Sequence, residues 1–119
     1  MLARRVVYPR GQWHLWIYCC AWRATDGRRQ IGDWSSKARI DRSAQFLNGQ
    51  RLTSVTLNQR GARAAFAFDL GGHLETQPYD RTSEQWLLYE PTGKVLIWRA
   101  DRRYSHELST KEPVWRRAG

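Results

Sequence analysis

Beyond residue 49 the chain is a succession of short segments in which apolar and polar residues alternate, and each segment ends at a turn signal. Alternation with a period of two places the apolar residues on one face of a β-strand. The segment 64–70 shows the pattern most clearly, and we expect Phe66 and Phe68 to be buried on one face of a central strand. This half of the chain therefore predicts an antiparallel meander of four or five strands.

Glycine, proline and polar residues that favour turns set the limits of these strands. The expected strands are 52–59, 64–70, 74–77, 85–90 and 94–99, with an edge strand at 104–108. The residues from Ser109 onward include Pro113 and the pair Arg116-Arg117. We expect this tail to be a surface arm.

The beginning of the chain predicts a β-hairpin. Every residue from Trp13 to Trp22 except His14 is apolar or aromatic, and a run that is apolar on both faces is typical of a covered central strand. Asp26-Gly27 is a hairpin signal and would return the chain as a shorter, more polar strand over 28–32, which begins with Arg28 and Arg29. A basic N-terminal arm precedes the hairpin and ends at Pro9-Arg10-Gly11.

Only the segment 36–47 has a convincing helical pattern, with Ser35 or Ser36 as its cap and Gly49 suited to the position after its end. Its inward stripe is expected to consist of Ala38, Ile40, Ala44 and Leu47. The predicted fold class is therefore α+β, a mostly antiparallel sheet curled around one helix, with a small open barrel as the alternative. We expect a single domain over 1–119, with a core over about 12–108 and basic arms.

The formal net charge of +9 favours an acidic partner. Seventeen of the twenty basic residues are arginine, a bias that a GC-rich genome also produces. The excess lies toward the ends, with +4 in residues 1–34, +2 in 35–98 and +3 in 99–119. The charge alone therefore leaves both a functional and a compositional explanation open.

Cys19 and Cys20 are neighbours whose side chains would point to opposite faces of a strand, so we expect two free thiols and a reducing compartment. No apolar run approaches the roughly 20 residues that span a bilayer, and the N-terminus lacks the apolar core of a signal peptide. We expect a cytoplasmic protein without a membrane partner.

The residue types that carry catalysis are scattered. His14, His73 and His106 lie in separate predicted elements, without a second ligand at metal-binding spacing. The chain has no nucleophile elbow, zinc-protease motif or phosphate loop. The segment Asp69-Leu70-Gly71-Gly72 leads into a strand and predicts a turn. We therefore expect no cofactor, no metal and no enzymatic activity.

Two groups of residues are candidates for contact with a partner. The first is a basic surface with an aromatic residue in it, formed by Arg28, Arg29, Trp34, Arg39 and Arg42, with Lys37 beside them. The alternative for this group is a solvated helix face with Trp34 packed at the start of the helix. The second group is Trp86, Tyr89 and Trp98 on the last hairpin, where one face would be core and the other could receive a partner.

Three stretches carry a resemblance to small uncharacterised bacterial proteins, some of which are immunity proteins of toxin systems. They are Leu47-Asn48-Gly49-Gln50-Arg51-Leu52, Phe66-Ala67-Phe68-Asp69-Leu70-Gly71-Gly72-His73-Leu74 and Glu84-Gln85-Trp86-Leu87-Leu88-Tyr89-Glu90-Pro91-Thr92-Gly93. The resemblance spans roughly residues 13–104 and rests on turn glycines, alternating core residues and a hairpin tryptophan. It includes no active-site motif, so it implies no functional residue.

These observations favour a non-enzymatic domain that binds another protein, such as an immunity or accessory protein of a bacterial toxin or defence system. An immunity protein against a cationic nuclease usually has an acidic surface, whereas this chain is basic. The alternative is a small nucleic-acid-binding protein that places its arginines on phosphates. Charge gathered on one face would favour nucleic acid, and charge spread over the ends would favour the compositional explanation.

Overall fold

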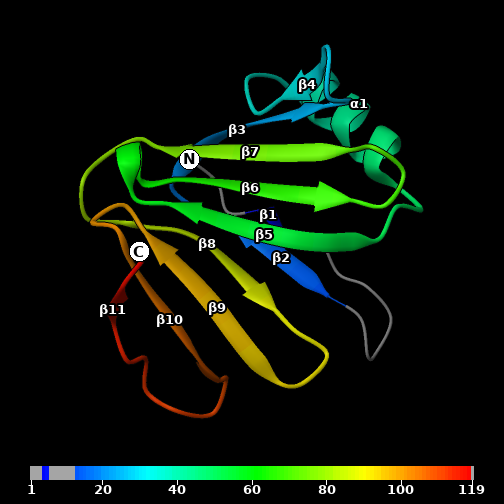
Figure 1. Cartoon of the computed structure of the whole chain (residues 1–119). Coiled ribbons are helices and arrows are strands. Elements are labelled where there is room, and N and C mark those ends of the chain that lie inside the picture. The colour runs from blue at the N-terminus through cyan, green and yellow to red at the C-terminus, as the bar shows by residue number, and fades with distance from the viewer. Residues whose placement is uncertain (1–3, 6–12, 119) are drawn as a thin grey trace. The chain divides into compact units, whose positions relative to one another are not determined.

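The computed structural model describes residues 4–5 and 13–118, and its chain divides into two compact units, residues 1–20 with 78–119 and residues 21–77 (Figure 1). The strands are β1 (Arg4–Arg5), β2 (His14–Ile17), β3 (Cys20–Thr25), β4 (Gln30–Asp33), β5 (Leu52–Asn58), β6 (Arg63–Phe68), β7 (His73–Pro78), β8 (Glu84–Tyr89), β9 (Lys94–Arg99), β10 (Arg103–Leu108) and β11 (Arg116–Arg117). The helix α1 covers Lys37–Leu47, and a short 3-10 turn, η1, covers Arg60–Ala62.

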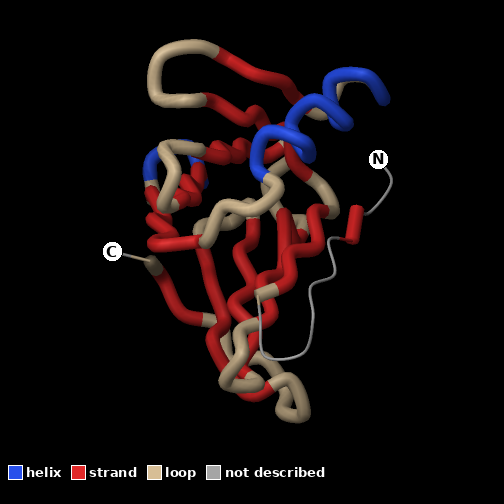
Figure 2. Tube along the Cα trace, turned by 90° about the vertical axis from the view of Figure 1, so that its right-hand side faces the viewer, coloured by secondary structure: helices blue, strands red, loops and turns tan. Residues whose placement is uncertain are grey.

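The fold class is α+β, as predicted, with antiparallel strands and a single α-helix in the described part of the chain. Figure 2 shows the strands in red and the helical segments in blue. The strands form two sheets instead of one curled sheet. One sheet has the order β1-β2-β8-β9-β10-β11, and the other has the order β4-β3-β7-β6-β5. The meander therefore divides after β7, and β5 to β7 belong to a different sheet from β8 to β10. Within the described residues, no helix is long and apolar enough to cross a membrane.

The apolar run 13–22 is not one strand, as we had expected, but parts of two. It is interrupted at Tyr18 and Cys19, and the Tyr18 backbone N–H donates to the carbonyl of Gln85 at 2.8 Å. On one side of the break β2 pairs with β8, and on the other side β3 pairs with β4. The break cannot be recognised in the sequence, because the residues before and after it are equally apolar. They are apolar because both strands are buried or half-buried along these positions.

The hairpin turn at Asp26-Gly27 is confirmed. The Asp26 carboxylate accepts from the backbone N–H groups of Arg28 at 2.9 Å and Arg29 at 2.8 Å, and Gly27 has a φ of 92°. These bonds keep both arginines in the turn, and the returning strand begins only at Gln30. The prediction that Arg28 and Arg29 lie on that strand is therefore wrong.

Helix α1 begins and ends close to where the sequence indicates. The Ser36 hydroxyl accepts from the Arg39 backbone N–H at 3.3 Å, and Gly49 has a φ of 84°. The buried face differs from the predicted stripe, because Ser43 is buried while Ala38 and Ala44 are exposed.

The reason for the different helix face is a close approach between α1 and β4 at Gly32. A Cβ at Gly32 would lie 2.3 Å from the Arg39 carbonyl oxygen and 2.3 Å from the Ser43 hydroxyl oxygen. Only glycine allows the strand this close to the helix backbone. Ser43 is small enough for the contact, and its hydroxyl donates to the Arg39 carbonyl at 2.9 Å.

The expected burial of segment 64–70 holds only in part. Phe66 is buried in β6, and Phe68 is half-buried. Leu70, which would continue the same face, is 71% exposed because β6 ends at Phe68 and the chain turns there. The turn is held by the Gly71 backbone N–H, which donates to the Phe68 carbonyl at 3.3 Å.

The core of the six-stranded sheet contains two tryptophans of the last hairpin. Trp86 on β8 and Trp98 on β9 are directly opposite each other, and both are fully buried. Tyr89, the third member of this group, is half-buried. Gln85 forms a bulge before Trp86, which brings its side chain into the interior as well. The paired tryptophans therefore belong to the core and not to a surface.

The C-terminal tail is not the loose arm that we had expected. Its residues Arg116–Arg117 pair with β10 as strand β11, and Ala118 is buried. The Arg99 guanidinium lies 4.5 Å from the centre of the Trp115 ring, an attractive cation–π distance. At the other end of the chain, β1 pairs with β2, and the predicted breaker Pro9-Arg10-Gly11 lies outside the described residues.

Cys19 and Cys20 are both free thiols, as predicted. Burial raises the pKa of the Cys20 thiol to about 12, and the neighbouring Cys19 adds to the rise. Because the pKa is higher in the folded than in the unfolded chain, the buried thiol contributes its full stability below about pH 8.5. This contribution is lost as the pH rises from there toward 12.

We therefore expect the free energy of unfolding to fall above pH 9 by up to about 1.4 kcal/mol per pH unit through Cys20 alone. Urea unfolding at several pH values measures this slope. Cys20→Ala removes the titrating group, so the variant should lose less stability between pH 8 and 11 than the wild type. Equal slopes in the two proteins would contradict the buried protonated thiol.

Candidate binding face on the five-stranded sheet

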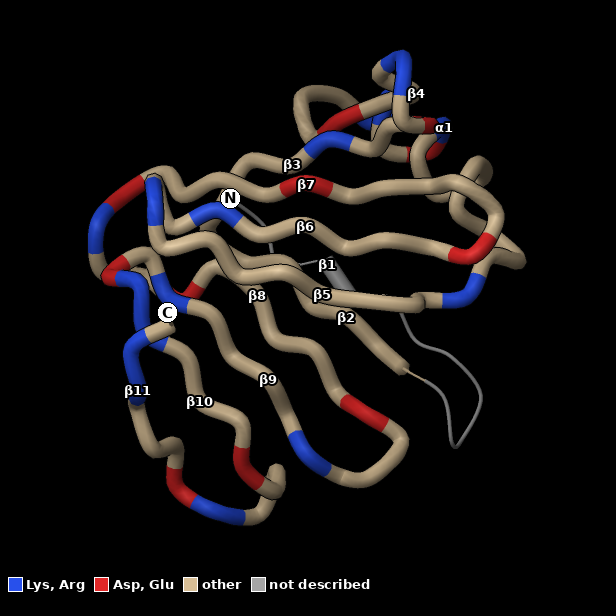
Figure 3. Tube along the Cα trace, viewed as in Figure 1, with Lys and Arg blue, Asp and Glu red and all other residues tan. Residues whose placement is uncertain are grey.

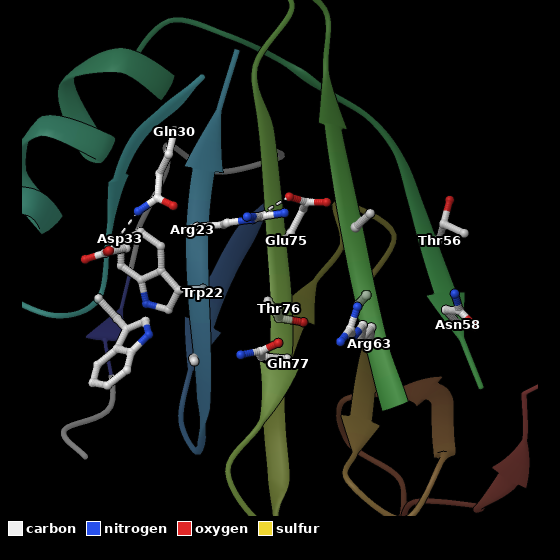
Figure 4. Close-up of a pocket in the computed structure, with 14 residues that line it drawn as sticks. Trp22, Arg23, Gln30, Asp33, Thr56, Asn58, Arg63, Glu75, Thr76 and Gln77 are labelled. Atoms are coloured by element: carbon white, nitrogen blue, oxygen red, sulfur yellow. Dashed lines mark hydrogen bonds and ion pairs between the residues drawn. The ribbon is translucent and has the colours of Figure 1, made fainter. Parts of the chain in front are cut away.

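One face of the five-stranded sheet carries an open hollow of about 580 Å³, lined by residues of the unit 21–77 (Figure 4). Strands β3, β4, β5, β6 and β7 all contribute to its lining. Most of the lining positions alternate with buried residues of their strands and carry polar side chains. The buried residues Ala21, Trp22, Ala64 and Thr76 complete the lining. The five-stranded sheet thus presents a mostly polar surface.

A row of residues crosses all five strands on this face. Thr56 lies opposite Ala65, and Ala65 lies opposite Glu75. The Arg23 side-chain Nε–H donates to the Glu75 carboxylate at 2.8 Å, and Arg23 lies opposite Asp33 on β4. Ala65 is the only small apolar side chain of the row, so the row leaves most room at β6, next to the edge strand β5, and carries polar side chains on both sides of that point.

Asp33 organises one border of the hollow, where β4 leads into α1. Its carboxylate accepts from the Ser35 hydroxyl at 2.5 Å and from the Ser35 backbone N–H at 2.9 Å. It also accepts from Gln30 Nε2 at 2.8 Å and from the Arg39 guanidinium at 3.3 Å. The bond from the Ser35 hydroxyl, followed by the backbone bond and Arg39, holds the pKa of Asp33 below its usual range.

Trp34 and Arg63 are two exposed side chains in the lining of the hollow. Trp34 follows Asp33 directly and is 42% exposed. Arg63 lies on β6 opposite Asn58 of the edge strand and is exposed. No ion pair of Arg63 is formed with any carboxylate in the described ranges.

The structure brings together only two of the five residues that the sequence predicted as a basic surface. Trp34 lines the hollow, and Arg39 reaches its border through Asp33. Arg28 and Arg29 are in the turn before β4, whereas Trp34 follows β4. The four residues of the strand lie between Arg29 and Trp34, which places these two about 16 Å apart along the extended chain. Arg42 is exposed on α1.

Lys37, which the sequence placed beside this group, is paired instead with Asp41 on the same helix, at 2.7 Å. Such an i,i+4 pair on a helix surface is common and weak. Two of the three cations on α1 therefore have carboxylate partners, Lys37 with Asp41 and Arg39 with Asp33. The helix face is less basic than its sequence indicates.

Three residues of this face, Arg23, Arg63 and Glu75, are not predicted from the sequence as members of a site. Each one is the polar member of an alternating strand, and such residues are the ordinary solvent side of a sheet. The signal that could have found them is the register, because the three strands that carry them become neighbours only in the order β3-β7-β6. That order is not contained in any local pattern.

The two carboxylates that line the hollow, Asp33 and Glu75, both interact with neighbouring donors. The lining includes no histidine or cysteine. Of its two carboxylates, Glu75 is paired with Arg23, and Asp33 accepts four hydrogen bonds that stabilise its charged form. A carboxylate with a lowered pKa is a weak general base. In the part of the chain that the structure describes, no three His, Cys, Asp or Glu side chains gather into a metal site.

The fold and this face define an α+β protein with an open, polar sheet surface. Comparison with protein families, with curated protein sequences and with solved structures gives no significant match to this chain.

Proposed function

We propose that this chain is a non-enzymatic domain that binds another protein through the polar face of its five-stranded sheet. The observation that carries the proposal is the balance of charge on this face, which has two positive side chains, Arg23 and Arg63, and two negative ones, Asp33 and Glu75. A role as an immunity or accessory protein of a bacterial toxin or defence system, in the cytoplasm, belongs to the same proposal.

The balanced charge favours a protein over a nucleic acid at this face. A phosphate backbone selects surfaces with an excess of cations, whereas a protein surface offers both signs and neutral hydrogen-bonding groups. The Arg23–Glu75 pair is about half exposed on both sides, and such exposed pairs contribute little to stability. Both side chains can therefore exchange partners when another protein covers them.

Trp34 is the expected centre of the contact. Tryptophan is among the residues that dominate the binding energy of protein interfaces, and this one stands partly exposed beside polar groups. Asp33 fixes the backbone on one side of it, and the Trp34 backbone N–H donates to the Trp22 carbonyl at 3.3 Å. An aromatic side chain on a fixed backbone loses less freedom on binding.

The test compares proteins captured from cells by the wild-type domain with those captured by Trp34→Ala and Arg63→Glu. A partner that uses this face binds the wild type, and its Kd should rise at least about 30-fold with Trp34→Ala, the effect of a central interface residue. Arg42→Glu makes the same charge change as Arg63→Glu, but on α1, and should alter the Kd less than about threefold. Partners that respond equally to Arg42→Glu and Arg63→Glu would contradict the proposal.

A further inference from the structure

Three arginines lie in or directly before the pairing of β10 with β11, at the edge of the six-stranded sheet (Figure 3). Arg103 on β10 lies directly opposite Arg117 on β11, and Arg102 immediately precedes β10. All three are exposed. We refer to Arg102, Arg103 and Arg117 as the β10–β11 arginine cluster.

The pairing of Arg103 with Arg117 is unfavourable by itself. Like charges at directly opposite positions of an antiparallel pair destabilise a sheet. Nearby, the Asp101 carboxylate is bound to the Arg99 guanidinium at 2.7 Å and accepts from the Arg103 backbone N–H at 3.2 Å. No guanidinium of the cluster forms an ion pair within the residues that the structure describes. The repulsion is therefore not relieved by a neighbouring acid.

Arg102 adds a second unfavourable feature at the same place. Its φ is 69°, a left-handed conformation that favours glycine. The turn between β9 and β10 is closed by the Arg102 backbone N–H, which donates to the Arg99 carbonyl at 3.1 Å. Glycine is the preferred residue at the left-handed position of such short hairpin loops. A strained conformation at a charged, exposed residue is a reason to look for function there.

The cluster is also held in place from several sides. On β11, the residues that flank the arginine pair are fixed, because the Trp115 ring contacts Arg99 and Ala118 is buried. The Val114 backbone N–H donates to the Ser105 hydroxyl at 3.1 Å, and the Ala118 backbone N–H donates to the Arg102 carbonyl at 3.4 Å. These contacts order the last strand before any ligand arrives, which lowers the entropic cost of binding.

We propose that the β10–β11 arginine cluster binds the phosphate backbone of a single-stranded nucleic acid. An arginine fork matches the oxygens of a phosphate group, and a bound anion removes the repulsion between Arg103 and Arg117. Trp115 lies two residues before Arg117, is half-buried and has the Arg99 guanidinium 4.5 Å from its ring centre. Aromatic side chains beside basic residues are the groups on which unpaired bases stack, and the partly exposed edge of this ring is the part that a base would reach. The cluster shares no residue with the protein-binding face, so the two proposals stand independently.

The affinity for a fluorescein-labelled oligothymidine of about 20 nucleotides, measured by anisotropy between 50 and 300 mM NaCl, tests this proposal. Three phosphate contacts give a log–log salt slope of about −2.1, and each contact contributes about 0.7 logarithmic units of affinity at 0.1 M salt. Arg103→Gln with Arg117→Gln should therefore weaken binding about 25-fold and make the slope shallower by about 1.4.

The matched control is Arg28→Gln with Arg29→Gln, which removes the same two charges from the turn after β3. This variant should lose less than about threefold in affinity, because those arginines are outside the cluster. Equal losses in the two double variants would show that only net charge attracts the oligonucleotide and would overturn the proposal. Tighter binding of a duplex of the same length would overturn the choice of a single strand.

Arg102→Gly separates binding from folding. Glycine relieves the left-handed strain, so the midpoint of thermal unfolding should rise, while the loss of one phosphate contact should weaken binding about fivefold. If Arg102 had only a structural role, its substitution would not raise the unfolding midpoint and weaken oligonucleotide binding at the same time. An unchanged affinity in Arg102→Gly, or no salt-dependent binding by the wild type, would mean that the arginines only keep the sheet edge from pairing with other chains.

Discussion

Replacing Trp86 or Trp98 with alanine should lower the free energy of unfolding by about 3–5 kcal/mol in each case. Both side chains are completely buried and are opposite each other on neighbouring strands, so either truncation leaves a large cavity in the six-stranded sheet. A domain of this size has a total stability of about 5–15 kcal/mol, and one substitution would remove a large part of it. Urea unfolding followed by circular dichroism measures the loss.

Leu108→Ala is the control for this experiment, since Leu108 lies on β10 of the same sheet and is 40% exposed. It should cost less than about 1 kcal/mol. Trp86→Phe keeps most of the buried volume and should recover much of the stability that Trp86→Ala loses. A loss below about 1 kcal/mol for both alanine variants would show that these rings are not in a packed core.

Phe66→Ala should destabilise the protein by a similar amount, about 3–5 kcal/mol, through the five-stranded sheet. Phe66 is 1% exposed on β6, with Leu74 and Val55 at the opposite positions of its two neighbouring strands. Phe68→Ala should cost less, about 1–2 kcal/mol, because part of its ring already contacts water. Leu70→Ala, at a largely exposed turn position, should cost under about 0.5 kcal/mol.

The order of these three losses is the diagnostic result. Thermal or urea unfolding of the three variants under one set of conditions gives it directly. Equal losses at positions 66, 68 and 70 would mean that the strand continues to residue 70 with one uniform inner face, as the alternating sequence alone predicts. The structure requires instead that the loss of stability decreases steeply from position 66 to position 70.

Local chemistry explains which parts of the fold could be predicted. The turn at Asp26-Gly27, the cap at Ser36 and the helix end before Gly49 all depend on side chains within a few residues of the feature, so the sequence contains the signal. The break at Tyr18 has no such signal, because its cause is a hydrogen bond to Gln85, 67 positions later in the chain. The division into two sheets depends on which strands pair with each other, and the local sequence pattern does not contain this information.

The candidate sites divide in the same way. Trp34 could be found because the sequence shows an aromatic residue between the pair Arg28-Arg29 and the basic residues of the helix. Arg23, Glu75 and Arg63 become one surface only through the pairing of three strands. The sequence predicts Arg116-Arg117 as part of a surface arm. The position of Arg117 opposite Arg103 depends on a strand of two residues, which is too short to show an alternating pattern.

The contact of α1 with β4 through Gly32 has a consequence for the dynamics of the binding face. Strand β4 has four residues and no second strand neighbour, and α1 buries only Ser43. Because they bury so little apolar surface, β4 and α1 should be the first part of the unit 21–77 to open. The free energy of this local opening should be well below the free energy of global unfolding. Amide protons of α1 should therefore exchange with solvent sooner than those of β6. Asp33 and Trp34 join the two elements, so a protein that binds them also holds the segment closed and slows the exchange of the whole helix.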